Sequence, residues 1–326
     1  ISENKDLEKR ISITPEIAKK YVNSGFSVNV EKGYGEHLGI SDKEFMSAGC
    51  EIQSKDHILK NSDLVLQMNL PEKNDLGLLN EKKILIGNFN SSNNKEIINE
   101  IKDKISVFSM ELLPRITRAQ SMDILSSQAN LAGYKAVVDS FAMFKKAIPM
   151  MMTAAGTISA AKVLVVGAGV AGLQAIATAK RMGAIVFATD VRIASKEQVE
   201  SLGGKFLLVD GAENLETEGG YAKEATEDFK KKQEELVLET LKKIDIVICT
   251  ALIPGKKAPK IINEKMIENM QPGSVIYDLA ASQGGNAAYT KADEIIEING
   301  VTIFGETTIL NKLPVSASNL YSKNLF

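Results

Sequence analysis

The chain has 326 residues, which at roughly 150 residues per domain suggests two domains, each large enough to bury its own core. Its 39 basic residues nearly balance its 41 acidic residues, so no strong field of one sign is available to hold nucleic acid or an anionic membrane. Two cysteines exclude a disulfide framework, and two histidines are too few for a histidine-rich metal cluster. We therefore expect a protein of a reducing compartment without a metal site.

Strand and helix patterns alternate over the first hundred or so residues. The pattern predicts strands at 11–13 and 26–30, separated by a helix that begins at Thr14-Pro15-Glu16 and ends at Gly25. Another helix starts at Ser41, and buried strands follow at 64–66 and 83–86. This alternation is typical of a parallel α/β sheet.

A long helix is predicted from Ser121 to about Lys146, and a second α/β series follows it. One face of the helix carries small residues that would let another element approach closely: Ala129, Ala132, Gly133 and Ala136. The later series has strands at 163–166, 185–189, 206–209, 244–249 and 275–279 and helices at 171–182 and 223–243, the element order of a doubly wound nucleotide-binding domain. We expect an α/β protein of two Rossmann-like or flavodoxin-like parallel-sheet domains with a cleft between them: a discontinuous domain of residues 1–125 plus 305–326, and a domain of residues 126–304.

The stretch from Ala147 to Ala179 is long enough to span a bilayer and carries one charge, Lys162. Pro149 and four glycines interrupt it, however, and a β-branched run lies in its middle. These features favour a buried strand and a tight turn over a spanning helix. The amino-terminal residues are mixed in charge and do not resemble a signal peptide.

Three further features receive ordinary structural interpretations. The run Met150-Met151-Met152 is expected to be adaptable packing. Cys249 lies in an apolar run and is expected to be a buried small hydrophobe without nucleophilic function. His37 and His57 lie away from every nucleotide motif and are assigned no chemistry.

The strand at 163–166 is followed directly by Gly167-Ala168-Gly169-Val170-Ala171-Gly172, at the start of a predicted helix. In this context Gly167 permits the tight turn, Gly169 lets the backbone approach a pyrophosphate at the positive end of the helix, and Gly172 allows close packing of helix on strand. Asp190, 18 residues after Gly172, stands at the end of the next strand, where a carboxylate accepts hydrogen bonds from the adenosine ribose. The pattern predicts NAD(H) binding; an ordinary glycine turn and a solvated strand end are the alternatives.

The residues after this strand bear on the choice between NAD(H) and NADP(H). Asp190 should repel the 2′-phosphate of NADP(H). Arg192 is discordant, because an arginine near this position can accept that phosphate. We favour NAD(H), with Asp190, Val191 and Arg192 as cofactor contacts.

Several segments closely resemble the NAD(H)-binding component, domain I, of proton-translocating nicotinamide nucleotide transhydrogenase. They are Pro114 to Tyr134, the glycine fingerprint and Ala188-Thr189-Asp190-Val191-Arg192. The similarity covers essentially the whole chain and includes Arg10 to Glu16, Thr250 to Gly255, Asp278 to Ala281 and Gly284-Gly285-Asn286. Alanine dehydrogenase and its relatives share the same two-domain framework.

The resemblance implies that Asp123 and Ser126 hold the nicotinamide carboxamide, that Arg115 helps to orient the cofactor and that Gln120 faces the partner nucleotide. It also implies a set of further cofactor contacts: Tyr221, Thr250, Ala251, Leu252, Gly285 and Asn286. The alternative for the first group is structural: Ser121 caps the long helix, Asp123 and Ser126 complement its first turns, and Arg115 is a surface cation.

Residues 210–222 are polar and glycine-rich and follow no strand or helix pattern. They resemble the family's mobile loop, which closes over NAD(H), with Gly219 and Gly220 as the hinge and Tyr221 as the ring that stacks on the nucleotide. The alternative is a plain surface loop.

The chemistry depends on whether the chain holds a base. A dehydrogenase of alcohols or amines must remove a proton as well as a hydride, and alanine dehydrogenases supply a lysine and a histidine from the first domain. Alignment by eye puts Asn69 and Asn90 in their places, and neither titrates. Direct hydride transfer between two nicotinamides requires no acid or base.

The resemblance therefore implies direct hydride transfer between NADH and NADP⁺ bound on a partner component, coupled to proton translocation by a membrane partner. The expected partners are the NADP(H)-binding domain III, the membrane proton-channel domain II and a second copy of the chain, with no nucleic acid and no direct membrane insertion. The expected location is cytoplasmic and peripheral on a bacterial inner membrane, or the matrix side of a mitochondrial one. An NAD-dependent alanine-type dehydrogenase and a non-catalytic NAD-binding module are the alternatives.

Overall fold

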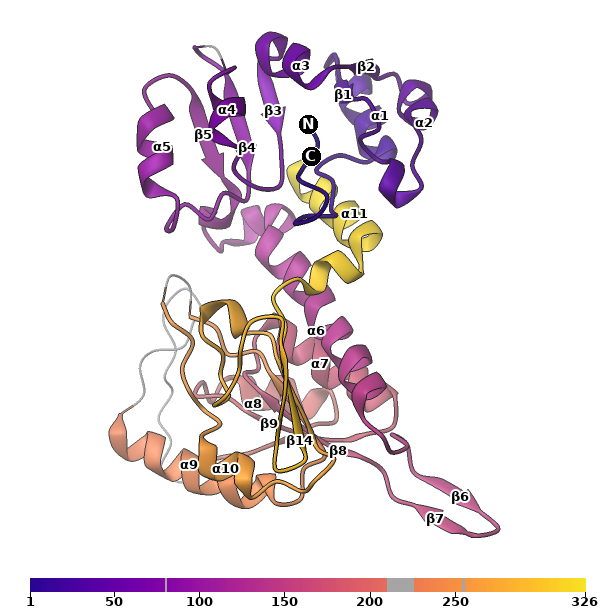
Figure 1. Ribbon diagram of the computed structural model, residues 1–326, viewed down its shortest axis with the longest axis vertical. Helices are drawn as coiled ribbons and strands as arrows, with labels where there is room; N and C mark the ends of the chain where they lie inside the picture. Colours follow the sequence, from indigo (N-terminus) through magenta and orange to yellow (C-terminus); the bar gives the residue numbers. More distant parts are fainter. Residues whose placement is uncertain (80, 210–225, 254–255) are drawn as a thin grey trace. The chain divides into compact units, whose positions relative to one another are not determined.

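The computed structural model describes residues 1–79, 81–209, 226–253 and 256–326. The chain separates into two compact units (Figure 1): residues 1–128 with 310–326, and residues 129–309. Both are α/β units whose strands pair mainly in parallel, which confirms the predicted fold class.

The first unit contains short parallel strands with helices between them. Strand β1 pairs with β2 in one sheet, and β3, β4 and β5 form another in that order. Separate apolar clusters fill the spaces against these two sheets. The elements are α1 (Pro15–Asn23), β1 (Asn29–Glu31), η1 (Glu36–Leu38), α2 (Asp42–Ser47), β2 (Glu51–Gln53), α3 (Lys55–Asn61), β3 (Leu64–Leu66), α4 (Lys73–Leu76), β4 (Ile84–Gly87), α5 (Lys95–Ile101), β5 (Ser106–Ser109), η2 (Met110–Leu112), η3 (Thr117–Met122) and α11 (Pro314–Leu325).

The strand predicted at 11–13 is wrong. These residues are buried, but their backbone N–H groups donate to side-chain hydroxyls instead of to a neighbouring strand. Ile11 N donates to Ser318 Oγ at 2.9 Å, and Ser12 N donates to Tyr34 Oη at 2.8 Å. The β-branched pattern correctly indicated burial, while the hydrogen-bond partners come from parts of the chain that the local sequence does not reveal.

The second unit is built on a seven-stranded sheet in the order β10-β9-β8-β11-β12-β14-β13. All neighbours are parallel except β13 and β14. The order reverses at β8, which lies between β9 and β11, and such switch points are where open α/β sheets bind ligands. The elements are β6 (Met151–Thr153), β7 (Gly156–Ile158), β8 (Lys162–Val166), α7 (Val170–Arg181), β9 (Ile185–Thr189), α8 (Ser195–Ser201), β10 (Lys205–Phe206), α9 (Glu227–Leu241), β11 (Ile246–Cys249), α10 (Glu264–Glu268), β12 (Val275–Asp278), η4 (Ala281–Gln283), β13 (Ile295–Ile298) and β14 (Val301–Gly305). Helix α6 (Ile124–Met143) and the turn η5 (Ile309–Lys312) lie on the two chain segments that join the units.

The small-residue face predicted on the long helix lets another helix approach closely. A Cβ atom added to Gly133 of α6 would lie 2.0 Å from the carbonyl oxygen of Ala171 in α7. That space exists only because residue 133 has no side chain. The fingerprint helix α7 thus packs closely on α6, with the carbonyl oxygen of Ala171 against the backbone of Gly133.

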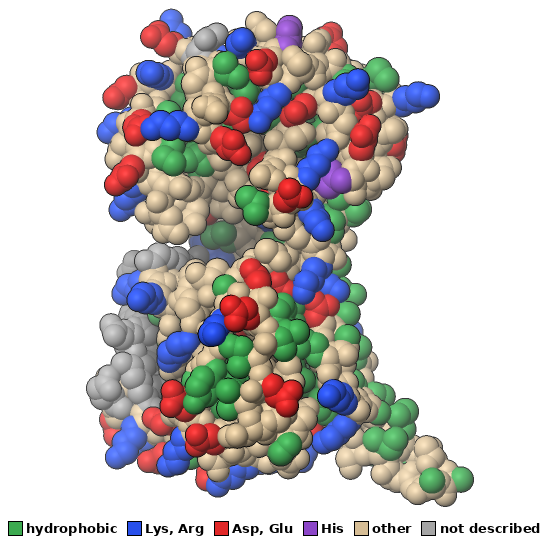
Figure 2. Space-filling model, viewed as in Figure 1, with side chains coloured by type: hydrophobic (Ala, Val, Ile, Leu, Met, Phe, Trp, Pro, Cys, Tyr) green, Lys and Arg blue, Asp and Glu red, His purple; other side chains and the backbone are tan. Residues whose placement is uncertain are grey.

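The methionine run does not pack in the interior, so the expectation for Met150, Met151 and Met152 is wrong. It leads into the antiparallel hairpin β6–β7, in which every residue is exposed. Met150 is 63% and Met152 81% exposed. Figure 1 shows the hairpin extending away from the body of the second unit, and Figure 2 shows hydrophobic side chains along it.

The stretch from Ala147 to Ala179 forms β6, β7, β8 and most of α7. Among the described residues, no helix is both long enough and apolar enough to cross a membrane.

Candidate nucleotide site

The turn between β8 and α7 is shaped by two glycines that tolerate no side chain. Gly167 has a φ of +95°, and a Cβ atom there would lie 2.9 Å from Thr250 Oγ1. A Cβ atom on Gly172 would lie 1.8 Å from the carbonyl oxygen of Gly167. The first glycine therefore meets a conformational demand and the third a packing demand, as the sequence predicted.

Gly169, the second glycine of the fingerprint, differs from Gly167 and Gly172. Its φ is −77°, which any residue adopts, and a Cβ atom there would meet no atom of the described residues within 4 Å. The residue is the N-cap of α7, so it lies where the first N–H groups of a 12-residue helix are unpaired within the helix. No contact among the described residues requires glycine here, whereas an anion held close to the backbone at the positive helix end would require it.

The loop after β11 lies against this turn. Thr250 donates from its backbone N–H to Val166 O at 2.8 Å, and its hydroxyl donates to Gly167 O at 2.9 Å. Asn286 then holds the next residue, Ala251, because its side chain accepts from Ala251 N at 3.0 Å and donates to Ala251 O at 2.8 Å. Leu252, the residue that follows Ala251, is 43% exposed.

Gly285 and Asn286 are placed by a buried carboxylate that the sequence reasoning did not single out. Asp278, at the end of β12, is fully buried and accepts from Asn286 N at 2.7 Å and from Thr290 Oγ1 at 2.8 Å. Gly285 has a φ of +78° within this turn. Asn286 is itself fully buried, and both of its amide hydrogens are donated to backbone carbonyls. The signal available in the sequence was an aspartate at the carboxyl end of a buried strand.

Asp190 lies beside the fingerprint and is bound from both sides. Its Oδ2 accepts from Ala168 N at 2.7 Å, which ties the end of β9 to the glycine turn. Arg192 donates to the same carboxylate from Nε at 2.9 Å and from Nη2 at 2.8 Å. Val191 between them is half-buried.

In the first unit, three of the four residues assigned to the nicotinamide end lie together. Ser126 donates from its hydroxyl to Asp123 Oδ2 at 2.6 Å and from its backbone N–H to Asp123 Oδ1 at 2.9 Å. Arg115 Nη2 donates to Ser126 Oγ at 3.1 Å and lies 3.8 Å from Asp123 Oδ2. Gln120 is exposed on η3, three residues before Asp123, and its backbone carbonyl oxygen accepts from Asp123 N at 3.3 Å.

The structural alternative for these residues is wrong about Ser121 as the cap, but its placement of Asp123 and Ser126 at the first turn of the helix is confirmed. Helix α6 begins at Ile124, and the backbone N–H of Ser126 at its third position donates to Asp123. Asp123 therefore has the geometry of an N-cap residue, and its negative charge lies at the positive end of the helix. Tyr221 and the loop that contains it lie outside the described residues.

The comparisons with known proteins agree on one family. Family models for the alanine dehydrogenase/PNT N-terminal and C-terminal domains match residues 1–132 and 136–326. The chain belongs to the alanine dehydrogenase/PNT family. It is 50% identical over 332 residues to the first of the polypeptides that make up the NAD(P) transhydrogenase alpha subunit of Rhodospirillum rubrum, an alignment that covers 99% of this chain and 86% of that one.

Solved structures of this family match nearly the whole chain. A transhydrogenase from Sinorhizobium meliloti superimposes with a TM-score of 0.91 at 44% sequence identity, covering 99% of this chain and 89% of that one. An L-alanine dehydrogenase superimposes with a TM-score of 0.80 at 19% identity, covering 99% of this chain and 86% of that one, and shows a shared fold. The resemblance seen in the motifs is thereby confirmed.

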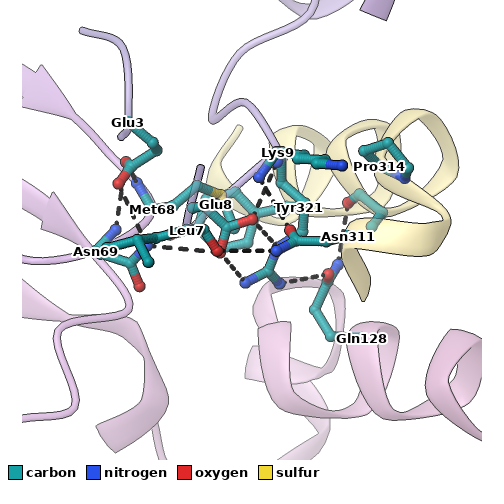
Figure 3. A network of polar contacts seen from close by, with 12 residues as sticks. Glu3, Leu7, Glu8, Lys9, Met68, Asn69, Gln128, Asn311, Pro314 and Tyr321 are labelled. Carbon is teal, nitrogen blue, oxygen red and sulfur yellow. Dashed lines mark hydrogen bonds and ion pairs between the residues drawn. The ribbon is translucent and has the colours of Figure 1, made fainter. Parts of the chain in front are cut away.

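Within this family, the surroundings of Asn69 bear on whether the chain carries a base. Its side-chain amide donates to Glu3 Oε2 at 3.2 Å, with Glu8 Oε2 at 3.5 Å (Figure 3). Glu8 in turn receives two hydrogen bonds from the guanidinium of Arg10, at 2.8 and 2.6 Å. Arg10 also donates to Gln128 Oε1 at 2.9 Å.

Glu3 is held in this network by the backbone and by the amide of Asn69. Burial raises the pKa of Glu3, and hydrogen bonds donated by Met68 N and by Asn69 oppose the increase. Met68 N donates to Glu3 Oε1 at 2.7 Å, so one oxygen is held by the backbone and the other by the amide of Asn69. The carboxylate is thus committed to structural contacts.

The two remaining sequence interpretations concern Asn90 and Cys249. Asn90 is exposed and has a φ of +46°, and its carbonyl oxygen accepts from Asn93 N at 2.9 Å, so it forms a turn. Cys249 is fully buried, and burial raises the pKa of its thiol well above the ordinary value. The burial of Cys249 confirms its interpretation as a buried small hydrophobe.

Proposed function

We propose that the chain is the NAD(H)-binding component of a proton-translocating transhydrogenase and passes a hydride between NADH and NADP⁺ held on a partner component. The observation that carries the proposal is Gly169, a glycine that the fold does not require but that a pyrophosphate at the start of α7 would require. The 50% identity to a transhydrogenase alpha subunit supports the choice of reaction.

The proposed reaction moves one hydride and no proton. The hydride leaves C4 of the dihydronicotinamide of NADH with both bonding electrons and adds to C4 of the NADP⁺ nicotinamide, giving NAD⁺ and NADPH. The chain therefore has to bind, orient and shield the nicotinamide, and it needs no general base. Asparagines at positions 69 and 90 are compatible with this requirement.

The cluster of Arg115, Asp123 and Ser126 has the chemistry to hold a carboxamide. A carboxamide offers two N–H donors and one carbonyl acceptor, while Asp123 supplies acceptor oxygens and Arg115 supplies donors. We propose that these groups exchange some of their mutual hydrogen bonds for contacts with the nicotinamide carboxamide. Fixing the carboxamide would fix the face of the ring from which the hydride leaves.

The surface around Gln120 is suited to a partner protein. Four large apolar side chains are exposed on the segment that carries the cluster: Leu112, Ile116, Met122 and Leu125, at 65%, 55%, 38% and 37%. Apolar side chains next to functional polar groups are typical of an interface. We propose that the NADP(H)-binding component, domain III, docks here and that Gln120 faces its nucleotide.

The exposed hairpin β6–β7 supports a homodimer. A two-stranded hairpin alone is marginally stable in water, and this one carries Met150, Met151, Met152 and Ile158 on its surface. We propose that it packs on a second copy of the chain. Met152→Lys should then shift the protein from dimer to monomer in light scattering, whereas Met46→Lys, a matched change at a 52% exposed methionine of α2 in the first unit, should not. A dimer that persists in both variants contradicts the role of the hairpin.

The proposed location is the cytoplasmic face of a bacterial inner membrane, or the matrix face of a mitochondrial one. There the chain would be held through the membrane proton-channel component, domain II, which would couple hydride transfer to proton translocation.

The decisive experiment mixes the purified chain with an NADP(H)-binding transhydrogenase component and follows transfer from NADH to an NADP⁺ analogue with a shifted absorbance. Transfer is expected only when both components are present. NADH formation from NAD⁺ and L-alanine by the chain alone would instead establish the amino-acid dehydrogenase alternative. NADH binding without transfer would favour a non-catalytic module.

A pair of serines tests the nicotinamide assignment. Ser126→Ala removes a hydroxyl from the cluster and should lower the transfer rate about tenfold or more, the effect of one lost positioning hydrogen bond. Ser47→Ala removes an exposed hydroxyl from α2 and should leave the rate unchanged. Equal rates in the two variants contradict the assignment.

A further inference from the structure

The carboxylate of Asp190 has no acceptor position left in this structure. A carboxylate offers about four lone-pair sites on its two oxygens. Oδ1 accepts from Arg192 N at 2.8 Å and Arg192 Nε at 2.9 Å, and Oδ2 accepts from Ala168 N at 2.7 Å and Arg192 Nη2 at 2.8 Å. The side chain of Asp190 is 7% exposed and that of Arg192 15%.

Of the four hydrogen bonds to Asp190, the two from backbone N–H groups are fixed and the two from the guanidinium can be broken by a side-chain movement. Ala168 N belongs to the glycine turn and Arg192 N to the chain directly after β9, so both are fixed by the fold. The guanidinium of Arg192 is at the end of a flexible side chain. A ribose hydroxyl that donates to Asp190 must therefore take a position that Nε or Nη2 now occupies.

The ion pair of Asp190 with Arg192 also changes the local charge at the place where the 2′-phosphate of NADP(H) would bind. A lone aspartate at this strand end repels a phosphate dianion, but a bidentate arginine in direct contact offsets that charge. Once displaced, the guanidinium can itself donate to phosphate oxygens.

We propose that Arg192 is a specificity-determining residue: its guanidinium must leave Asp190 when the adenosine ribose binds, so that the pair sets the preference for NAD(H) over NADP(H). The inference rests on the proposed function, since it requires a dinucleotide at the fingerprint. Arg192 weakens the discrimination that Asp190 alone would provide. Removing its charge should sharpen that discrimination.

The experiment measures the dissociation constants of NADH and NADPH by fluorescence titration of the full chain. In Arg192→Gln, the ratio of the NADPH constant to the NADH constant should rise about tenfold or more, because Asp190 is left uncompensated. The NADH constant should stay within about threefold of its original value or fall, since acceptor positions on Asp190 become free. Arg181→Gln is the matched control: it removes the same charge from an exposed arginine at the other end of α7 and should leave the ratio unchanged.

Two further variants separate charge from structural damage. Arg192→Lys keeps the charge and should keep the ratio close to that of the unaltered protein, whereas Asp190→Asn should lower it by favouring NADPH. A ratio that is unchanged in Arg192→Gln, or equal shifts in Arg192→Gln and Arg192→Lys, would overturn the proposal. Failure of the unaltered chain to bind NADH would instead refute the proposed function, so the two failures are distinguishable.

Discussion

The open position at Gly169 allows a substitution that separates ligand binding from folding. In Gly169→Ala the new methyl group meets no atom of residues 1–79, 81–209, 226–253 or 256–326 within 4 Å, and the φ of −77° suits alanine. Alanine is a poorer N-cap than glycine, but it lowers the entropy of the unfolded chain, and each effect is about 1 kcal/mol or less. The free energy of unfolding should therefore change by less than about 1 kcal/mol, and the melting temperature by a few degrees at most.

The effect on NADH binding should be much larger. The methyl group would occupy the space through which a pyrophosphate reaches the N–H groups at the start of α7. Loss of one such hydrogen bond to a charged group costs about 1.5–3 kcal/mol, which corresponds to an increase in the dissociation constant of about 10- to 150-fold.

The matched variant is Gly172→Ala, in which the methyl group would lie 1.8 Å from the carbonyl oxygen of Gly167. The turn has to move to admit it, so this variant should lose both stability and NADH binding. Thermal unfolding and fluorescence titration of the two variants give the comparison. NADH binding by Gly169→Ala at the original affinity would refute the proposed pyrophosphate contact, because no atom of the described residues lies close enough to require glycine at this position.

Three other substitutions test the physical account of the fold. Gly133→Ala should cost about 1–3 kcal/mol of stability, because its Cβ would lie 2.0 Å from Ala171 O; an unchanged melting temperature would contradict close packing of α6 on α7. Arg10→Met should cost about 3–5 kcal/mol in chemical denaturation by leaving Glu8 buried without its cation, and the double variant Glu8→Leu/Arg10→Met should recover most of it. Burial raises the pKa of Glu3, so its contribution to stability is fully present below its ordinary value of 4.5 and is lost as the pH rises through the raised value. Glu3→Gln should flatten the pH dependence of the melting temperature over that window, and an unaltered slope would show that Glu3 does not cause it.

The fingerprint could be predicted from sequence because its information is local. The strand, the three glycines and the following helix are contiguous. Gly167 adopts a φ of +95° within the turn itself, and Gly172 packs against the carbonyl oxygen of Gly167. Asp190 is close in sequence as well, and its bond to Ala168 N is set by the pairing of β8 with β9. Periodicity and turn chemistry suffice for such a unit.

The features that the sequence reasoning missed depend on distant partners or on overlooked turn signals. Ile11 is buried as expected, but its backbone donates to Ser318, 307 residues away. The hairpin β13–β14 has a turn signal, Asn299-Gly300 with φ values of +51° and +76°, that was not used. The run Met150–Met152 was expected to pack but is exposed. Apolar composition alone does not distinguish the interior of a protein from a surface that another molecule covers.

The surroundings of Asn69 show why a buried carboxylate here does not restore a dehydrogenase base. A base must present a free lone pair to the substrate proton, and a raised pKa alone does not supply one. Glu3 accepts from Met68 N and from the amide of Asn69, while Glu8 is held bidentately by Arg10. Both carboxylates stabilise the arrangement of the first unit, so their removal should be seen in its stability. The proposed hydride transfer between two nicotinamides needs position alone, so it is compatible with Glu3 and Glu8 being held in structural contacts.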